Sequence, residues 1–400
     1  MNNLLLLSLV LIVAIIAEKI TSKFNLPTVT GYVVFGIIFG KSLVGLFGSD
    51  FLSSVSVIND IALGAIAFTI GAELKRKTFK RLGKSIFFIV FFEAIFTFIF
   101  VSTGMYLLHP DKFYQAIILG AVASATAPAA TVMVLNQYNA KGPLTSTILA
   151  VVGIDDSIAL IIFAFASTTA KSLLKGSSLT ISRMLVSPME EIFFSIILGV
   201  IMGLVFNHLF KNVRGPKKLV IRISAAILLL LGITTQFDLS ELLTIMAFAA
   251  TISNINSTFT TRSHKVIANI SPVFYALFFI LAGARLDITL LPVVGVMGLL
   301  YTLLRMGGKY SGATLGAILG NAPKVVKKYV GFGLIPQVGV ALALAIIVNK
   351  TFGGGNYGDA GIMLAKVVIN ILLFTTIITE IVGPLLTGMA VKKAGEDNEN

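Results

Sequence analysis

Long apolar runs separated by short polar connections fill almost the whole chain. A helix needs about 20 residues to cross the hydrocarbon core of a bilayer, and most of these runs reach that length. A soluble core of this size could not bury so much apolar surface. The pattern predicts an all-α polytopic membrane protein with about 13 transmembrane helices, at residues 4–22, 27–46, 54–73, 85–108, 113–136, 144–169, 189–210, 219–235, 239–253, 269–286, 290–320, 326–349 and 357–390.

Composition and charge agree with a chain that lies in the lipid bilayer. The sequence is 56% hydrophobic and 12% charged, whereas soluble domains carry about 25% charged residues. The net charge of +13 would suggest a nucleic-acid partner for a soluble protein. Here 21 of the Lys and Arg residues lie in loops after odd-numbered spans and 6 in loops after even-numbered spans. The positive-inside rule therefore predicts a multi-pass plasma-membrane protein with its N-terminus outside and its C-terminus in the cytoplasm, and no nucleic-acid partner.

Two of the predicted spans, the fifth and the twelfth, carry a proline in mid-run beside small or polar residues. Pro128 follows Thr126 in the fifth span, and Pro336 precedes Gln337 in the twelfth. Each is the fifth span of a six-span half, and the two cross the membrane in opposite directions. This predicts an inverted-topology repeat with two crossed broken helices, whose backbone and polar side chains form an ion site. The alternative is two simple packing kinks.

Asp155 and Asp156 lie side by side in the middle of the sixth span. An acid at the centre of a bilayer costs about 2.5–3.5 kcal/mol on insertion scales, so two in succession indicate a function. Ionised carboxylates can bind Na⁺ or Li⁺, and the same oxygens can bind a proton. The pair is therefore a predicted site for a transported cation and a proton, the alternative being structural acids paired to another helix. Neighbouring helical positions point about 100° apart, so the two carboxylates need not play the same role.

Lys309, in the eleventh span, is the predicted partner of these acids because an ammonium at that depth requires a carboxylate. Glycines around Lys309 permit close helix approach, and Arg305 lies one helical turn away on the same face. Alternatively, both cations snorkel to the cytoplasmic surface. Glu93 and Lys366 have no assigned role at this stage, and Glu380 is expected near a helix end.

Six motifs in order along the chain carry a resemblance to a known family: Leu26–Tyr32, Phe68–Leu74, Ala125–Thr131, Gly142–Thr145, Gly308–Lys309 and Leu334–Gln337. With the aspartate pair, they resemble the monovalent cation:proton antiporter superfamily, in particular its two-aspartate bacterial and archaeal sodium:proton exchangers. The resemblance implies that Asp156 is the main carrier of ion and proton. It also implies that Asp155 pairs with Lys309 in the ion-free state. Aspartate rather than asparagine at position 155 favours electrogenic exchange.

The same resemblance implies a homodimer that works by alternating access, with a dimerisation domain and a core domain that moves like an elevator. It implies no cofactor; the partners are the bilayer, a monovalent cation and the proton. The expected division of the chain is scaffold spans at 1–80, first half of the core at 81–175, linker and scaffold spans at 176–268, second half of the core at 269–390 and a cytoplasmic tail at 391–400.

Other functions remain open on the sequence. A K⁺:H⁺ antiporter of the same fold would use the same hard oxygen ligands. A sodium-coupled organic anion symporter would also use broken helices but would need a basic anion pocket, which no motif marks. An intramembrane aspartyl protease needs two carboxylates that converge and share a proton. Asp155 and Asp156 diverge on one helix, so we expect a transporter and not an enzyme.

Overall fold

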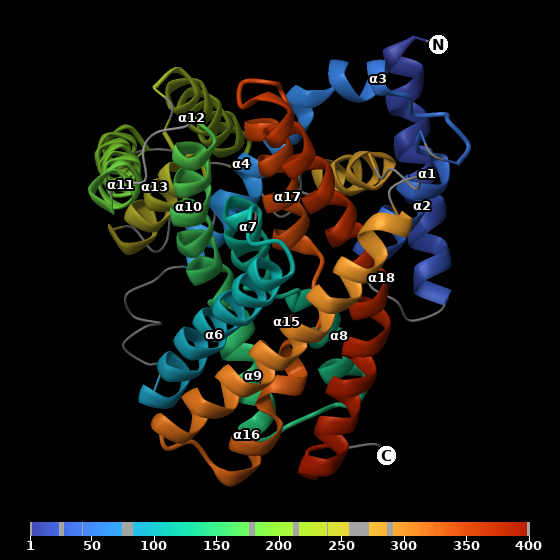
Figure 1. Ribbon diagram of the computed structural model, residues 1–400, viewed down its shortest axis with the longest axis vertical. Helices are drawn as coiled ribbons and strands as arrows, with labels where there is room; N and C mark the ends of the chain where they lie inside the picture. Colours follow the sequence, from blue (N-terminus) through green and yellow to red (C-terminus); the bar gives the residue numbers. More distant parts are fainter. Residues whose placement is uncertain are drawn as a thin grey trace. The chain divides into compact units, whose positions relative to one another are not determined.

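The computed structural model describes residues 2–23, 28–41, 43–73, 83–175, 181–210, 216–237, 239–255, 272–285 and 291–397. Within these ranges the chain is almost entirely helical, and its β-structure is one isolated bridge between Gly40 and Phe47. The all-α fold is thereby confirmed (Figure 1). The chain forms two compact units, one of Met1–Leu11, Ser49–Arg81 and Ser178–Phe278, the other of Ile12–Gly48, Leu82–Ser177 and Phe279–Asn400. The scaffold and core roles given to the five predicted segments stay predictions.

The first unit contains five labelled helices, α3 (Ser49–Ser54), α4 (Ser56–Glu73), α11 (Ile181–Phe210), α12 (Pro216–Gln236) and α13 (Glu241–Ile255). Helix α13 packs against α4 and α11. Gly71 of α4 touches the backbone of Met246, and the Ser253 hydroxyl donates to the carbonyl of Ala72 at 2.7 Å. Small residues thus let these helices approach closely. Helix α1 (Asn3–Lys23) and the helix Pro272–Ala284 each belong partly to both units.

The second unit holds every predicted site residue. Its helical elements are α2 (Thr28–Phe39), α6 (Lys84–Leu108), α7 (Phe113–Ala123), α8 (Pro128–Gln137), α9 (Pro143–Val152), α10 (Asp155–Leu174), α15 (Leu291–Leu319), α16 (Lys324–Tyr329), the 3₁₀ helix η2 (Val330–Leu334), α17 (Gly339–Phe352) and α18 (Gly358–Ala394). Both predicted helix breaks are present, one between α7 and α8 and one between η2 and α17. The second break bends the chain by 44°.

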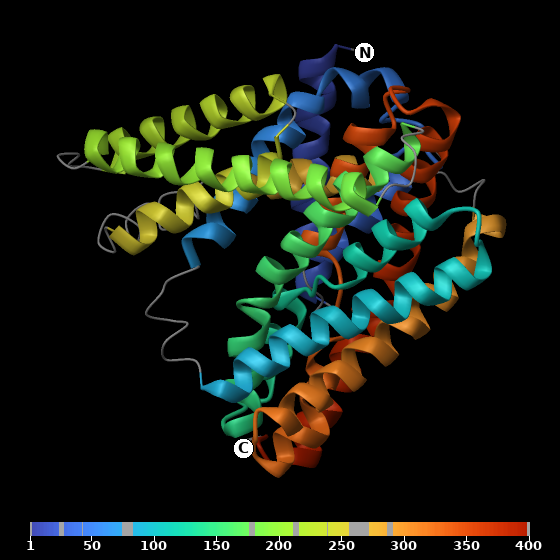
Figure 2. The same ribbon diagram turned by 60° about the vertical axis from the view of Figure 1, so that its left-hand side comes forward.

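Helices α6 and α15 run side by side along their length (Figures 1 and 2). Four glycines spaced by one helical turn, three in α15 and one directly after it, face α6, and a Cβ at any of them would lie within 2.7 Å of α6 backbone atoms: Gly308, Gly312, Gly316 and Gly320. At Gly312, for example, an added Cβ would lie 2.5 Å from the carbonyl oxygen of Phe92 and 2.8 Å from the Cα of Glu93. This glycine stripe brings the two backbones together, as small residues do between membrane helices.

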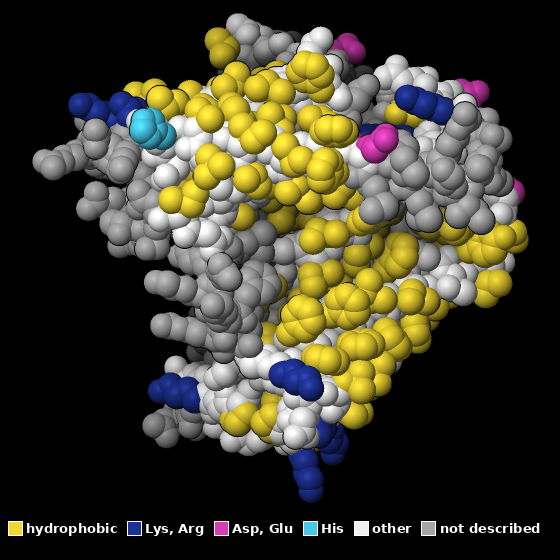
Figure 3. Space-filling view, turned by 90° about the vertical axis from the view of Figure 1, so that its left-hand side faces the viewer, with side chains coloured by type: hydrophobic (Ala, Val, Ile, Leu, Met, Phe, Trp, Pro, Cys, Tyr) yellow, Lys and Arg dark blue, Asp and Glu magenta, His cyan; other side chains and the backbone are white. Residues whose placement is uncertain are grey.

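The predicted number of membrane spans can be compared with the lengths and hydropathies of the described helices. Among the described residues, six helices are long and apolar enough to cross a bilayer, or seven with the bent pair as one span. Four apolar helices are shorter, so the predicted count of 13 is not confirmed. Helix α2 ends at Phe39, well before the predicted boundary at residue 46, and the N–H groups of Val44 and Phe47 donate to the carbonyls of Ile38 and Phe39 at its end. In space-filling view, hydrophobic side chains cover much of the face shown, and most of its charged side chains lie near the edges (Figure 3).

The predicted sixth span is also interrupted, by residues 153–154 between α9 and α10. The two aspartates are therefore the first two residues of α10 rather than mid-helix residues. The structure also places two charged residues of the predicted thirteenth span. Glu380 lies deep inside α18 with 0% exposed surface, so the expected position near a helix end was wrong. Lys366, on the same helix, is exposed.

The N-terminus of α9 is capped from the other end of the chain. The carboxylate of Glu396 accepts hydrogen bonds from the backbone N–H groups of Leu144 and Thr145 and from the Thr145 hydroxyl, each at 2.7 Å. The carbonyl of Glu396 accepts from the N–H of Lys141 at 3.0 Å. Gly142 offers no side-chain cap, and a Cβ there would collide with the Glu396 carboxyl group. A negative group at this place satisfies free N–H donors and complements the helix dipole.

We expect Glu396→Gln to lower the free energy of unfolding by about 1 kcal/mol, because an amide loses the charge and one of the two acceptor oxygens. The measurement is the thermal unfolding midpoint of the purified protein in detergent. Asp397→Asn, at the next position, is the matched control and should melt like wild type. Equal midpoints for the two variants would contradict the capping role of Glu396.

Candidate functional site

The two helix breaks touch each other in the interior of the second unit. The N–H of Ala127, between α7 and α8, donates to the carbonyl of Pro336, between η2 and α17, at 2.9 Å. The Thr131 hydroxyl of α8 donates to the carbonyl of Gly333 at 2.9 Å. Backbone groups freed by one break are thus partly satisfied by the other, as buried polar groups require.

Gln337 links the crossing to two further elements. Its side-chain amide donates to the carbonyl of Val122 in α7 at 3.1 Å and to the Tyr301 hydroxyl of α15 at 2.9 Å. Its backbone carbonyl accepts from the hydroxyls of Thr376 and Thr379 on α18 at 3.3 and 3.4 Å. These bonds make Gln337 a bridge between helices at the crossing.

The guanidinium of Arg305 occupies the place where both half-helices end. It donates from Nε to Ala123 at 3.0 Å, from Nη2 to Ala125 at 2.9 Å, from Nη1 to Ile335 at 2.5 Å and from Nη2 to Pro336 at 3.4 Å, all to carbonyl oxygens. Its exposed fraction is 0%. A cation here satisfies carbonyls that lack helical partners and complements the negative ends of α7 and η2. Arg305 does not snorkel to the surface.

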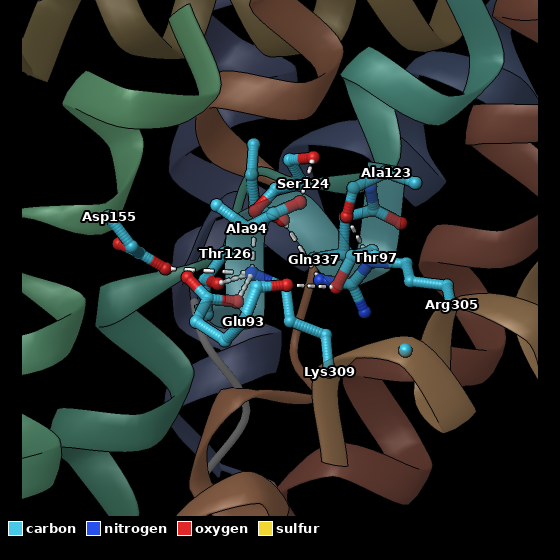
Figure 4. A network of polar contacts seen from close by, with 12 residues as sticks. Glu93, Ala94, Thr97, Ala123, Ser124, Thr126, Asp155, Arg305, Lys309 and Gln337 are labelled. Atoms are coloured by element: carbon cyan, nitrogen blue, oxygen red, sulfur yellow. Dashed lines mark hydrogen bonds and ion pairs between the residues drawn. The ribbon is translucent and has the colours of Figure 1, made fainter. Parts of the chain in front are cut away.

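Lys309, one turn along α15, also has 0% exposed surface and does not snorkel. Its ammonium donates to Glu93 Oε2 at 2.5 Å, to the Ser124 carbonyl at 2.5 Å and to Thr126 Oγ1 at 2.7 Å (Figure 4). Asp155 Oδ2 is farther away, at 3.7 Å. The lysine therefore contacts the first helix break, the acid of α6 and, more loosely, the first acid of α10.

The two aspartates differ in their surroundings. Asp155 has 0% exposed surface, and its Oδ1 accepts from the backbone N–H of Asp156 at 2.9 Å. Its Oδ2 has no hydrogen-bond partner. Asp156 keeps 8% of its surface exposed. Both lie in the first turn of α10, where the positive end of the helix dipole favours negative charge.

The structure gathers most of the predicted site residues but not all of them. Asp155, Lys309 and Thr126 meet in one cluster, whereas Gln337 and Pro336 meet Arg305 and α7 instead. Helix α8 begins at Pro128, whose side chain lies outside the described part. The described residues contain no group of three or more His, Cys, Asp or Glu that could hold a metal ion. A cation at the aspartate pair would thus need hydroxyl, carbonyl or water oxygens as well.

Sequence reasoning missed the closest carboxylate to Lys309, which is Glu93. It is the one acid in the span 85–108 and is fully buried. Two signals in the sequence pointed to this pair. An acid inside an apolar span needs a cation, and the glycines around Lys309 indicate that another helix lies close to it. The sequence did not say which helix supplies that neighbour.

The sequence is similar to those of known sodium/hydrogen exchangers over nearly its whole length. The sequence model described as "Sodium/hydrogen exchanger, transmembrane" matches residues 6–393. An Na⁺/H⁺ antiporter of Enterococcus hirae is 22% identical over 394 residues, covering 97% of this chain and 98% of that protein. The probable Na⁺/H⁺ antiporter GerT of Bacillus cereus is 26% identical over 349 residues, covering 85% and 88%.

Solved structures show the same fold. Two structures of the sodium proton antiporter MjNhaP1 from Methanocaldococcus jannaschii superpose with TM-scores of 0.73, at pH 8, and 0.75. Each covers 98% of both chains at 16% sequence identity. The likeness at this identity concerns the arrangement of the helices and says nothing about individual side chains.

We expect Arg305→Gln to lower the free energy of unfolding by more than about 2 kcal/mol, because each buried carbonyl left without a donor costs about 1–3 kcal/mol. The thermal unfolding midpoint in detergent measures the effect. Lys366→Gln removes a positive charge from an exposed position of the same unit and serves as the control. A midpoint for Arg305→Gln within the range of that control would show that the guanidinium does not hold the crossing together.

Proposed function

Because the chain belongs to the sodium/hydrogen exchanger family and exchanges sodium ions for protons across a membrane, we propose that Asp155 and Asp156 form its cation and proton site. The observation that carries this proposal is the position of both acids at the start of α10, with one buried Asp155 oxygen free of hydrogen bonds. Na⁺ is a hard cation that prefers carboxylate, hydroxyl and carbonyl oxygens. A carboxylate that holds either Na⁺ or H⁺, but not both, couples the two fluxes.

Within this site we assign Asp156 as the main carrier and Asp155 as its helper. Asp156 keeps contact with the surface, whereas Asp155 is fully buried and accepts a hydrogen bond from the Asp156 backbone. The crossed breaks beside them supply polar backbone at the same depth. The names of the Enterococcus and Bacillus relatives support Na⁺ as the cation. K⁺ and Li⁺ remain alternatives of the same chemistry, and an organic anion would require a basic pocket.

Several finer features belong to the same proposal. We propose alternating access by an elevator movement of a core domain that includes 81–175 and 269–390, a homodimer, and a plasma-membrane topology with the C-terminus in the cytoplasm. The family resemblance supports the first two, and the distribution of Lys and Arg between loops supports the third. Cross-linking in membranes and accessibility labelling of loop positions test the dimer and the topology.

We further propose electrogenic exchange of two protons for one Na⁺, with Asp156 and Lys309 as the proton carriers. Support comes from the aspartate at position 155 and from the closeness of Lys309 to it. One net charge per cycle is worth about 2.3 kcal/mol per 100 mV, enough to drive roughly a fifty-fold Na⁺ gradient. Electroneutral exchange, with Lys309 only as a structural cation, is the competing mechanism.

The first functional prediction concerns the aspartates. Asp156→Asn should reduce exchange to the level of protein-free vesicles, since the amide neither titrates nor balances the charge of the cation. Asp155→Asn should retain partial exchange. The measurement is collapse of an imposed pH gradient in proteoliposomes on addition of Na⁺, Li⁺ or K⁺, with the exposed Asp359→Asn variant as control. Exchange at wild-type rate by Asp156→Asn protein would refute the assignment.

The second functional prediction concerns voltage. An inside-negative potential should accelerate exchange in which two protons enter for each Na⁺ that leaves, because that cycle moves positive charge inward. The potential is set with valinomycin and K⁺ once K⁺ has been excluded as a substrate. Exchange rates that do not change with the imposed potential would refute the electrogenic mechanism and favour the competing one.

A further inference from the structure

The ammonium of Lys309 has no hydrogen-bond donor left for Asp155. An ammonium carries three N–H donors, and three acceptors take them: Glu93 Oε2, the Ser124 carbonyl and Thr126 Oγ1, at 2.5, 2.5 and 2.7 Å. Asp155 Oδ2 lies at 3.7 Å and has no hydrogen-bond partner. Lys309 thus acts on Asp155 by charge alone, and its directed bonds go elsewhere.

Glu93 reaches this position because of the packing between α6 and α15. The glycine stripe places Gly312 directly against the Cα of Glu93 and Gly308 against the Cα of Thr97, so Lys309 faces the same turn of α6. Both members of the ion pair have 0% exposed side chains. A buried carboxylate and a buried ammonium each need the other, since either alone would be strongly destabilising.

We propose that Glu93, whose ion pair with Lys309 is shorter than that of Asp155, is the counter-ion that holds Lys309 in place, and that Glu93 is thereby a positioning residue for cation binding. It anchors the ammonium on α6 and the first helix break, so that Asp155 Oδ2 stays open to the incoming cation. The inference rests on the proposed function, because it concerns how the aspartate site is kept ready for Na⁺.

The position of Lys309 decides how strongly it competes with Na⁺. If the ammonium donated a hydrogen bond to Asp155, each arriving Na⁺ would first have to break a charge-assisted bond. Such bonds are about twice as strong as neutral ones. With Glu93 as the hydrogen-bonded partner of Lys309, Na⁺ meets an Asp155 oxygen to which the ammonium donates no hydrogen bond. Removal of the Glu93 charge would leave Asp155, at 3.7 Å, as the nearest carboxylate to the ammonium, so Lys309 would be drawn towards it.

The test is the Na⁺ dependence of exchange in proteoliposomes. Glu93→Gln should raise the apparent KM for Na⁺ by at least about tenfold, with a much smaller change in the maximal rate. Glu93→Asp keeps the carboxylate on a shorter side chain and should give an intermediate KM. Thr97→Val, one turn away on α6, removes a hydroxyl that bonds only the Glu93 backbone carbonyl and should keep the wild-type KM.

A second measurement separates positioning from a structural role. Na⁺ raises the unfolding temperature of any protein that binds it in the folded state. The Na⁺ concentration for half-maximal stabilisation should rise in Glu93→Gln protein. It should fall back towards the wild-type value in the Glu93→Gln/Lys309→Gln double variant, because the competing ammonium is gone. A merely structural defect would not be relieved by the second substitution.

The outcomes are distinct. A wild-type KM in Glu93→Gln protein, or a double variant that binds Na⁺ no better than the single one, overturns the role of Glu93. If Glu93→Gln protein does not fold, Glu93→Asp decides, and a wild-type KM there overturns the role as well. Absence of any Na⁺ response in wild type would overturn the proposed function itself. If Na⁺ stabilises the wild-type protein but not Asp156→Asn protein, the proposed function stands, whatever the Glu93 variants show.

Discussion

Two broken helices inside a bilayer leave carbonyl groups without helical partners, and one guanidinium satisfies four of them. Arg305 donates to four carbonyl oxygens from both breaks. Lipid offers no water to do this, so the breaks are possible only where protein groups replace it. Because Arg305 and Lys309 are one turn apart on α15, the cation that holds the crossing also fixes the place of the cation next to the aspartates.

The second constraint is the distance between α6 and α15. The glycine at every fourth position from 308 to 320 allows the backbone of α15 to lie on that of α6. Larger residues at Gly308 or Gly312 would separate the helices and move Glu93 away from Lys309. The ion pair between Glu93 and Lys309 forms only because α6 and α15 lie in backbone contact. The same contact excludes solvent from both charges, which then require each other.

Sequence alone predicted the helical membrane fold, both helix breaks and a place for Lys309 near the aspartates, and the family resemblance pointed to Asp155 in particular. The breaks were predictable because Pro128 and Pro336 interrupt apolar runs, and a proline removes a backbone donor wherever it stands in a helix. The partner of Lys309 was not predictable in the same way. Hydrophobic runs say that a helix is present, but they do not say which two helices touch, and Glu93 is 216 residues away from Lys309.

Local signals also failed where a distant segment completes the structure. The cap of α9 comes from Glu396, 252 residues after Leu144, and Gly142 before α9 suggests only that no local cap exists. No proline lies at residues 153–154, so the sequence did not predict the interruption there. It changes the interpretation of the acid pair, because residues at the start of a helix meet free N–H groups and the positive dipole end, whereas residues in mid-helix meet neither.

At the proposed cation site, two electrostatic interactions oppose the cost of burying the carboxylates. Negative charge on Asp155 and Asp156 is favoured by the start of α10 and by an ammonium 3.7 Å from Asp155. These are fields rather than directed bonds, so they favour the ionised carboxylates without occupying Asp155 Oδ2. Under the proposed function, a cation or a proton would bind an Asp155 oxygen to which Lys309 donates no hydrogen bond. A strong bond from Lys309 to Asp155 would occupy this oxygen, and the structure gives that bond to Glu93 instead.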